Sequence, residues 1–297
     1  MDLMRIGAFE IREPIPELRE PHVFASLRPW VDVNNVGTMT LDGLEVQFGA
    51  KELGQLVKPG VFYDFTRYRP TLYYEGGERR IRIPNSRVSY AKREKGNDFL
   101  FLRLLEPQAL GERFVDSVLK LMAVFQAKRY TLLGSMYDAV PHTRPLIVNG
   151  RASGAQAEMD LKKAGVHESH YEGPTTITSL IPYRGSGVGM ESLTLIVSLP
   201  QYVNVEEDYL GKVRLLEVLN VIYGIPIDKE DFEKAGRQRS LLNQKIETSP
   251  ELKKALGHLE NIYSLRMTRK DGEQLPGLSS EMEQIFWDSD GKDSGKA

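Results

Sequence analysis

The chain of 297 residues contains no cysteine and no long apolar run. The lack of cysteine excludes disulfides, thiolate metal sites and a cysteine nucleophile, so any chemistry must use other side chains. The longest apolar runs, such as residues 193–199, are far shorter than a membrane span, and residues 1–9 lack an apolar stretch of signal-peptide length. We therefore expect a cytoplasmic protein without a membrane partner.

An excess of charge of one sign is also missing, because 39 Lys and Arg residues face 41 Asp and Glu residues, for a formal charge of -2. Such a balance creates no global field that would attract a polyanion. We expect no nucleic-acid partner.

What is present is an alternation of strand-like and helix-like segments. Continuous apolar or β-prone runs occupy residues 23–27, 99–104, 130–133 and 193–199. Between them, residues 110–128 and 155–164 have the character of helices, the first with apolar side chains at spacings of three and four. This order predicts an α/β fold of three αβα layers, with helices on both faces of a mostly parallel sheet.

Residues 71–83 predict a β-hairpin. Two β-prone runs, 71–74 and 79–83, flank Glu75-Gly76-Gly77-Glu78, a connection of hairpin length. A two-stranded ribbon is marginally stable alone, so we expect it to pack on a neighbouring subunit in a homo-oligomer.

The C-terminal part has a different pattern, with helices alone at 228–248 and 250–267. The apolar stripe of the second helix, Leu252, Leu256, Leu259 and Tyr263, is too short for an independent coiled coil, so the two helices should fold back on the core. We therefore predict an α/β core domain at 1–224, a helical lid at 225–268 and a mostly flexible tail at 269–297.

Polar side chains follow three of the predicted strands, at the edge where ligands bind in open parallel sheets. Glu106 follows one strand, Asp138, His142 and Arg144 follow the next, and Tyr202 follows a third. Together they predict a crevice that holds an anion-binding arginine beside a possible general base. The alternative is that these residues only pack the loops or form a subunit interface.

Other patterns carry weaker signals. A Gly-rich run at 185–189 precedes a strand rather than a helix and is read as a connection, and His167 and His170 have no third metal ligand nearby. No Gly-x-Ser-x-Gly elbow and no Walker-type lysine loop occurs, so we expect no cofactor, no metal and no assigned catalytic residue. One basic cluster could attract an anion or be a solvated hairpin face: Arg67, Arg69, Arg79, Arg80, Arg82 and Arg87.

Several short motifs share an order and spacing with a known family. They are Arg69-Pro70, Glu106-Pro107, Val140-Pro141-His142-Thr143-Arg144-Pro145, Tyr171-Glu172-Gly173-Pro174, Pro200-Gln201-Tyr202 and Leu259-Glu260-Asn261-Ile262-Tyr263. From about residue 22 to residue 265 the chain resembles the bacterial branch of the proteasome assembly chaperone two family. The resemblance implies a core like that of purine nucleoside phosphorylases, a helical lid over the crevice and a homotrimer.

The resemblance implies no established activity, because the eukaryotic and archaeal relatives are non-catalytic chaperones of the proteasome α-ring. Those chaperones dock through a C-terminal hydrophobic-Tyr-any residue motif, whereas this sequence ends Asp293-Ser294-Gly295-Lys296-Ala297. We expect no direct insertion into an α-ring pocket.

Two functional hypotheses follow. The sequence favours a non-enzymatic scaffold or assembly factor that binds an unidentified protein partner. The alternative is a binder of anionic small molecules, or a phosphorylase- or hydrolase-like enzyme, in which His142 is the base and Arg144 the anion clamp.

Overall fold

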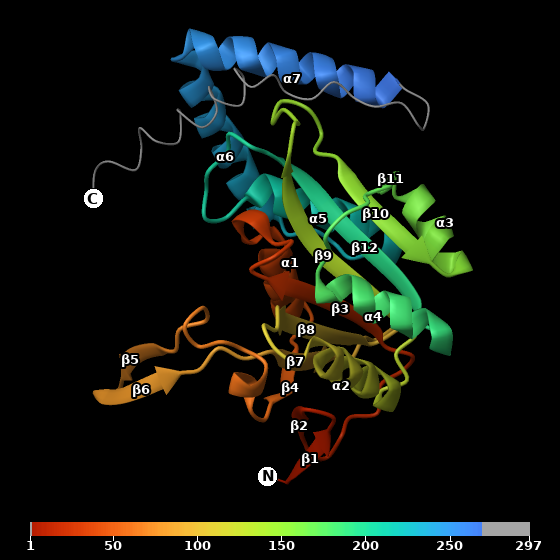
Figure 1. Cartoon of the computed structure of the whole chain (residues 1–297). Coiled ribbons are helices and arrows are strands. Elements are labelled where there is room, and N and C mark those ends of the chain that lie inside the picture. Colours follow the sequence, from red (N-terminus) through yellow and green to blue (C-terminus); the bar gives the residue numbers. More distant parts are fainter. Residues whose placement is uncertain (1, 269–297) are drawn as a thin grey trace.

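A ten-stranded sheet forms the middle of the protein, which a computed structural model describes from residue 2 to residue 268 (Figure 1). The strand order is β1-β2-β4-β7-β8-β3-β9-β12-β10-β11. In chain order the strands are β1 Leu3–Ile6, β2 Phe9–Arg12, β3 His22–Arg28, β4 Lys51–Leu56, β7 Arg87–Ala91, β8 Phe99–Leu105, β9 Arg129–Asp138, β10 Val148–Ser153, β11 His167–Glu168 and β12 Glu191–Pro200. The central strands β8, β3, β9 and β12 are parallel, while β1, β2, β4 and β7 pair with their neighbours in antiparallel fashion. Strand β10 is antiparallel to β12 and parallel to β11.

Helices cover both faces of this sheet. They are α1 Val36–Gln47, α2 Gly111–Val124, α3 Ala155–Lys163, α4 Ile177–Gly185, α5 Tyr209–Tyr223, α6 Lys229–Glu247 and α7 Pro250–Thr268, with short 3-10 turns at Val33–Asn35, Pro59–Val61 and Ser186–Val188. One core cluster lies under α1, α3 and α5, and a second lies under α2 and α4. The three-layer α/β architecture that the sequence predicted is confirmed.

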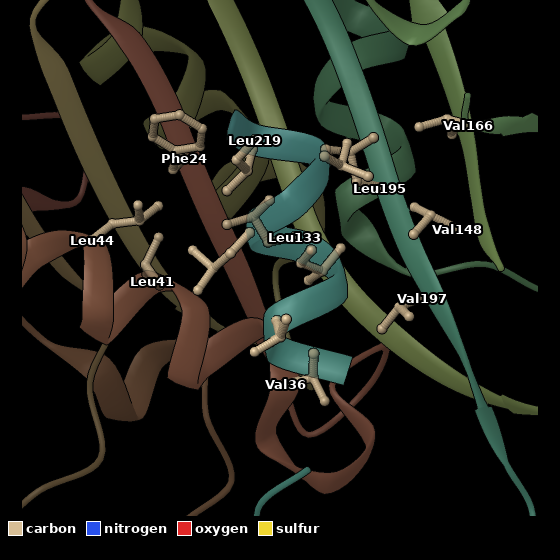
Figure 2. Packing of buried hydrophobic residues seen from close by; sticks show 14 of the residues in the cluster. Phe24, Val36, Leu41, Leu44, Leu133, Val148, Val166, Leu195, Val197 and Leu219 are labelled. Atoms are coloured by element: carbon tan, nitrogen blue, oxygen red, sulfur yellow. The ribbon is translucent and has the colours of Figure 1, made fainter. Parts of the chain in front are cut away.

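The first cluster contains fully buried side chains of the sheet, α1 and α5. Figure 2 shows Leu41 and Leu44 of α1 and Leu219 of α5 around Phe24, all of them fully buried. Each fully buried side chain of this size stabilises the fold by roughly 1.5–3 kcal/mol. Tyr223, at the end of α5, extends the cluster with an edge-on contact to the Phe24 ring at 5.1 Å.

The loop after β3 lies directly on the backbone of β9. The Ser135 N–H donates to the Val31 carbonyl at 2.9 Å, and a Cβ added to Gly134 would lie 2.4 Å from that oxygen. Gly37 is equally close to the Leu133 carbonyl, at 2.4 Å from its ideal Cβ. Glycine is therefore required at both positions. In the same loop, the backbone of Val31 has a φ of 57°, which is unfavourable for a β-branched residue.

The sequence did not predict helix α5. It also did not predict several flanking elements, among them β1, β2, β4, β7, β10, β11 and α4. The residues of α5 buried in the structure are Leu210, Gly211, Lys212, Val213, Leu215, Leu216, Val218 and Leu219, which span most of its circumference because α5 lies between the sheet and α6. A helix buried on most sides lacks the one-sided apolar stripe that identifies a helix in a sequence.

Two parts extend from this body (Figure 1). Strands β5 (Thr71–Glu75) and β6 (Glu78–Arg82) form a separate antiparallel hairpin with the register that the Gly-containing connection indicated. At the other end, α6 leads to α7, and a small apolar cluster joins both helices to Tyr202 and Val203. The division into core and lid domains stays a prediction, and the predicted tail at 269–297 lies outside the described residues.

Helix α6 is fastened to α5 near its start. Lys212 of α5 donates to Asp231 of α6 at 2.6 Å, with both side chains nearly buried. The Tyr209 N–H of α5 donates to the Gln238 side chain of α6 at 2.9 Å.

No helix in the described part of the chain combines the length and the apolar character needed to cross a bilayer.

Tyr130 provides a test of this packing. Its hydroxyl is fully buried in β9 and has no hydrogen-bond partner within residues 2–268, whereas the Tyr223 hydroxyl lies 3.0 Å from the Thr131 hydroxyl. Because an unpaired buried hydroxyl is costly, Tyr130→Phe should raise the free energy of unfolding by about 1 kcal/mol or more, while Tyr223→Phe should lower it by a similar amount. Urea unfolding of the three proteins measures both, and a destabilised Tyr130→Phe variant would contradict the assignment.

Candidate functional site

The loop between β9 and β10 and the end of β12 meet α6 and α7 at one surface, which we call the lid junction. It contains Asp138, His142 and Tyr202 from the core side and Asn243 and Arg266 from the helices. This surface lies beyond the carboxyl ends of β9 and β12, where the sequence predicted a crevice.

His142 is the centre of the lid junction and is only 2% exposed. Its Nδ1 lies 2.7 Å from the Tyr202 hydroxyl, and its Nε2 lies 2.9 Å from the Asn243 side-chain oxygen. Since that oxygen only accepts, Nε2 carries the hydrogen, and the Tyr202 hydroxyl donates to Nδ1 while it accepts from the His142 backbone N–H at 2.9 Å. Burial lowers the pKa of His142 despite the Asn243 hydrogen bond, which favours the neutral imidazole with Nδ1 as the acceptor.

Asp138 ends β9 and joins the core to α7. Arg266 donates to both carboxylate oxygens, at 2.8 and 3.2 Å, and the Ser198 hydroxyl donates at 2.8 Å. Burial opposes ionisation of Asp138, but these hydrogen bonds and the charge of Arg266 outweigh it and lower the pKa of the carboxyl group. The pair is a charged contact between core and lid.

Arg144 lies at the rim of the lid junction rather than inside it. Its side chain is about half exposed and its Nε lies 3.9 Å from Glu260 of α7. Glu260 also accepts from the Thr143 hydroxyl at 2.6 Å, and the Tyr263 hydroxyl donates to the Pro145 carbonyl at 2.9 Å. The loop at 138–145 therefore contacts α7 along several residues.

Glu106 is at a different place, two strands away from β9 at the end of β8. Its carboxylate accepts from the Ile177 N–H at 3.2 Å, at the start of α4, and its second oxygen is buried without a partner among the described residues. Burial raises the pKa of Glu106, although the Ile177 hydrogen bond opposes the change. None of the contacts described above joins Glu106 to the lid junction.

The structure thus brings together Asp138, His142 and Tyr202, with Arg144 beside them. Sequence reasoning missed the lid residues Asn243 and Arg266. Glu260 and Tyr263 were within the Leu-Glu-Asn-Ile-Tyr motif quoted above, whereas Asn243 sits in a polar stretch of α6 that gives no signal of a buried contact. That these residues bind a ligand stays a prediction.

No group of three or more His, Asp or Glu side chains suited to a metal occurs within residues 2–268.

The Asp138–Arg266 pair yields a test of the lid contact. Arg266→Gln removes hydrogen bonds to a charged group worth about 1.5–3 kcal/mol, so amide exchange in α7 and in the loop at 138–145 should accelerate about tenfold or more at pH 7. Lys253→Gln, on an exposed part of α7, is the matched control and should leave exchange unchanged.

The pH dependence of the same contact has a definite sign. Because the folded pKa of Asp138 is lowered, the contact is complete above the ordinary aspartate value of 3.8 and is lost as the pH falls through the lower, folded value. The free energies of unfolding of Arg266→Gln and of the unchanged chain should therefore approach each other at acid pH. Equal exchange of Arg266→Gln and the unchanged chain at pH 7 would show that this pair does not hold the helix.

Comparisons with known proteins agree with this architecture. The family model described as the PAC2 family matches residues 26–243. The comparison with curated proteins gave no match. A PAC2 family protein from Streptomyces avermitilis is 25% identical, with a TM-score of 0.69 over 75% of this chain and 95% of its own.

Two more distant structures share the fold. A Mycobacterium tuberculosis proteasome-assembly chaperone homologue is 22% identical, with a TM-score of 0.70 over 78% of this chain and 98% of its own. The Pyrococcus furiosus protein PbaB, described as an archaeal proteasome activator, is 14% identical, with a TM-score of 0.61 over 80% of this chain and 98% of its own. Because the family model covers well over half of the sequence, and its span includes β8, β9, β12 and the His142 loop, the chain belongs to the PAC2 family.

Proposed function

We propose that this protein is a non-enzymatic assembly factor that acts in the cytoplasm by binding another protein. Family membership supports this role, since structural relatives are described as a proteasome-assembly chaperone homologue and as an archaeal proteasome activator.

The proposal rests on the hydrogen bonds that occupy both ring nitrogens of the buried His142. Both ring nitrogens are occupied, by Tyr202 and by Asn243, and the side chain is buried. A general base must reach the proton that it abstracts, and no nitrogen of this imidazole is available to a ligand while α6 and α7 are in place. The arrangement supports a structural role for the lid junction over the enzymatic alternative.

Self-assembly is the second part of the proposal. Strand alternation places Leu72, Tyr74, Arg79 and Ile81 on one face of the β5–β6 hairpin, and the apolar members of this set are exposed, Tyr74 by 71% and Ile81 by 63%. Apolar groups gathered on a projecting ribbon are typical of a contact surface. We propose that this face packs on a second copy of the chain, in a trimer as the family resemblance implies.

The partner hypothesis predicts stoichiometric recovery of a second protein. The full chain, carrying an affinity tag and expressed in its source cell, should capture one other protein in an amount comparable to its own under mild conditions, as measured by quantitative mass spectrometry. The tag alone is the control for background. Recovery of the chain only, with nothing else near equal abundance, would remove the main support for an assembly role.

The self-assembly hypothesis predicts a mass of three times 33.6 kDa by light scattering. The double change Leu72→Ser and Ile81→Ser, or replacement of the hairpin by a tight turn, should lower the mass to that of one chain. Glu78→Gln, at the exposed hairpin tip, is the matched control and should not change it. Equal masses for the unchanged chain and for the variants without the apolar face would refute the role of the hairpin.

A further inference from the structure

A cavity of about 1120 Å³ lies between the hairpin, α1 and strands β7 and β8, far from the lid junction in the fold. Charged and aromatic side chains line it from five elements: Arg28 of β3, Asp42 and Glu45 of α1, Tyr73 and Arg82 of the hairpin, Arg87 of β7 and Arg103 of β8. The hairpin residues involved belong to the face opposite Leu72 and Ile81. One face of the ribbon thus borders the cavity, while the apolar face points away from it.

Strand register concentrates positive charge on one wall of this cavity. Arg87 of β7 is directly opposite Arg103 of β8, and Arg103 is in turn opposite Ser26 of β3. Arg28 lies two residues beyond Ser26, on the same face of the sheet, because side chains alternate along a strand. Three adjacent strands therefore present arginines side by side, and like charges directly opposite one another are destabilising.

The carboxylates of the cavity pair with Arg103 rather than with the other arginines of this wall. Asp42 and Glu45 both contact Arg103, and Glu52 pairs with Arg12 outside the cavity at 3.3 Å. Within the described residues Arg28, Arg82 and Arg87 form no ion pair. Arg82 lies over the Tyr73 ring, 5.0 Å from its centroid, which fixes the direction of its guanidinium group.

We propose that this cavity binds a small organic molecule that carries phosphate groups, with Arg28, Arg82 and Arg87 as its anion ligands. The planar guanidinium group matches phosphate oxygens in a two-pronged geometry, and several arginines from different elements suit an anion with more than one charge. At about 1120 Å³ the cavity slightly exceeds the usual size range of small-molecule sites and is much larger than a phosphate ion requires. The ligand therefore has an organic body in addition to its phosphates.

Calorimetric titration of the full chain with ADP, pyrophosphate and inorganic phosphate tests this site. ADP should bind with a dissociation constant below about 1 mM, and at least tenfold more tightly than pyrophosphate. Equal dissociation constants for ADP and pyrophosphate would overturn the proposal that the ligand has an organic body. No binding of any of the three at millimolar concentration would overturn the site.

Variants assign the binding to these arginines. Arg28→Gln and Arg87→Gln should each weaken ADP binding by at least tenfold. Arg80→Gln changes an arginine near the tip of the same hairpin, which pairs with Glu75 and Glu78 and does not line the cavity, and should bind ADP as the unchanged chain does. An equal loss of affinity in Arg80→Gln and Arg87→Gln would mean that the basic hairpin attracts anions without a defined site.

Thermal unfolding gives an independent readout. Without ligand, Arg87→Gln should have a melting temperature close to that of the unchanged chain, because Arg87 is exposed and forms no ion pair within the described residues. With ADP, only proteins that bind it should gain stability, so the unchanged chain and Arg80→Gln should shift upward and Arg87→Gln should not. A marked loss of stability in ligand-free Arg87→Gln would instead assign a structural role to this residue.

Discussion

The contact between the loop after β3 and the backbone of β9 is the constraint on which the arrangement of the protein depends. Gly37 and Gly134 allow carbonyl oxygens to approach so closely that no side chain fits at either position. Asp32 adds to this contact by accepting from the Thr38 hydroxyl at 2.6 Å, at the start of α1. The direction of α1, and with it one wall of the arginine-lined cavity, is therefore set by where this loop lies on β9.

The same contact determines what the carboxyl edge of the sheet can do. With the loop fixed between β3 and β9, Glu106 at the end of β8 is separated from Asp138 at the end of β9. The edge consequently carries two unlike environments. At one, the Glu106 carboxylate accepts from the Ile177 N–H at the start of α4. At the other, His142 is hydrogen-bonded to Tyr202 and Asn243.

Sequence reasoning predicted the parts of the fold that have a strong local signal. The apolar run of β8, the Gly-Gly connection of the hairpin and the apolar stripe of α7 each identify an element without reference to its surroundings. Helix α5 was missed because it is buried on most sides. The short flanking strands such as β2 and β4 were missed because they are only four to six residues long. Their assignment requires the tertiary pairing that no local pattern contains.

The candidate sites show the same limit. Proximity of Asp138, His142 and Tyr202 follows from the rule that carboxyl ends of parallel strands share an edge, but their partners Asn243 and Arg266 come from helices whose docking the rule does not describe. The basic cluster was visible in the sequence, yet only the pairing of β7 with β8 and of β5 with β6 separates Arg87, which borders the cavity, from Arg79, which faces away.

The fastening of α6 to α5 has a mechanical consequence for the lid. Moving the start of α6 away from α5 would break the nearly buried Lys212–Asp231 ion pair and the hydrogen bond between Tyr209 and Gln238. The first half of α6 is thereby held to α5, and the turn at Gly224 is not a hinge. Any swing of α7 away from the loop at 138–145 must pivot at Thr248 and Ser249, the two residues that separate the helices, so the moving arm is α7 alone and Asn243 of α6 stays on His142.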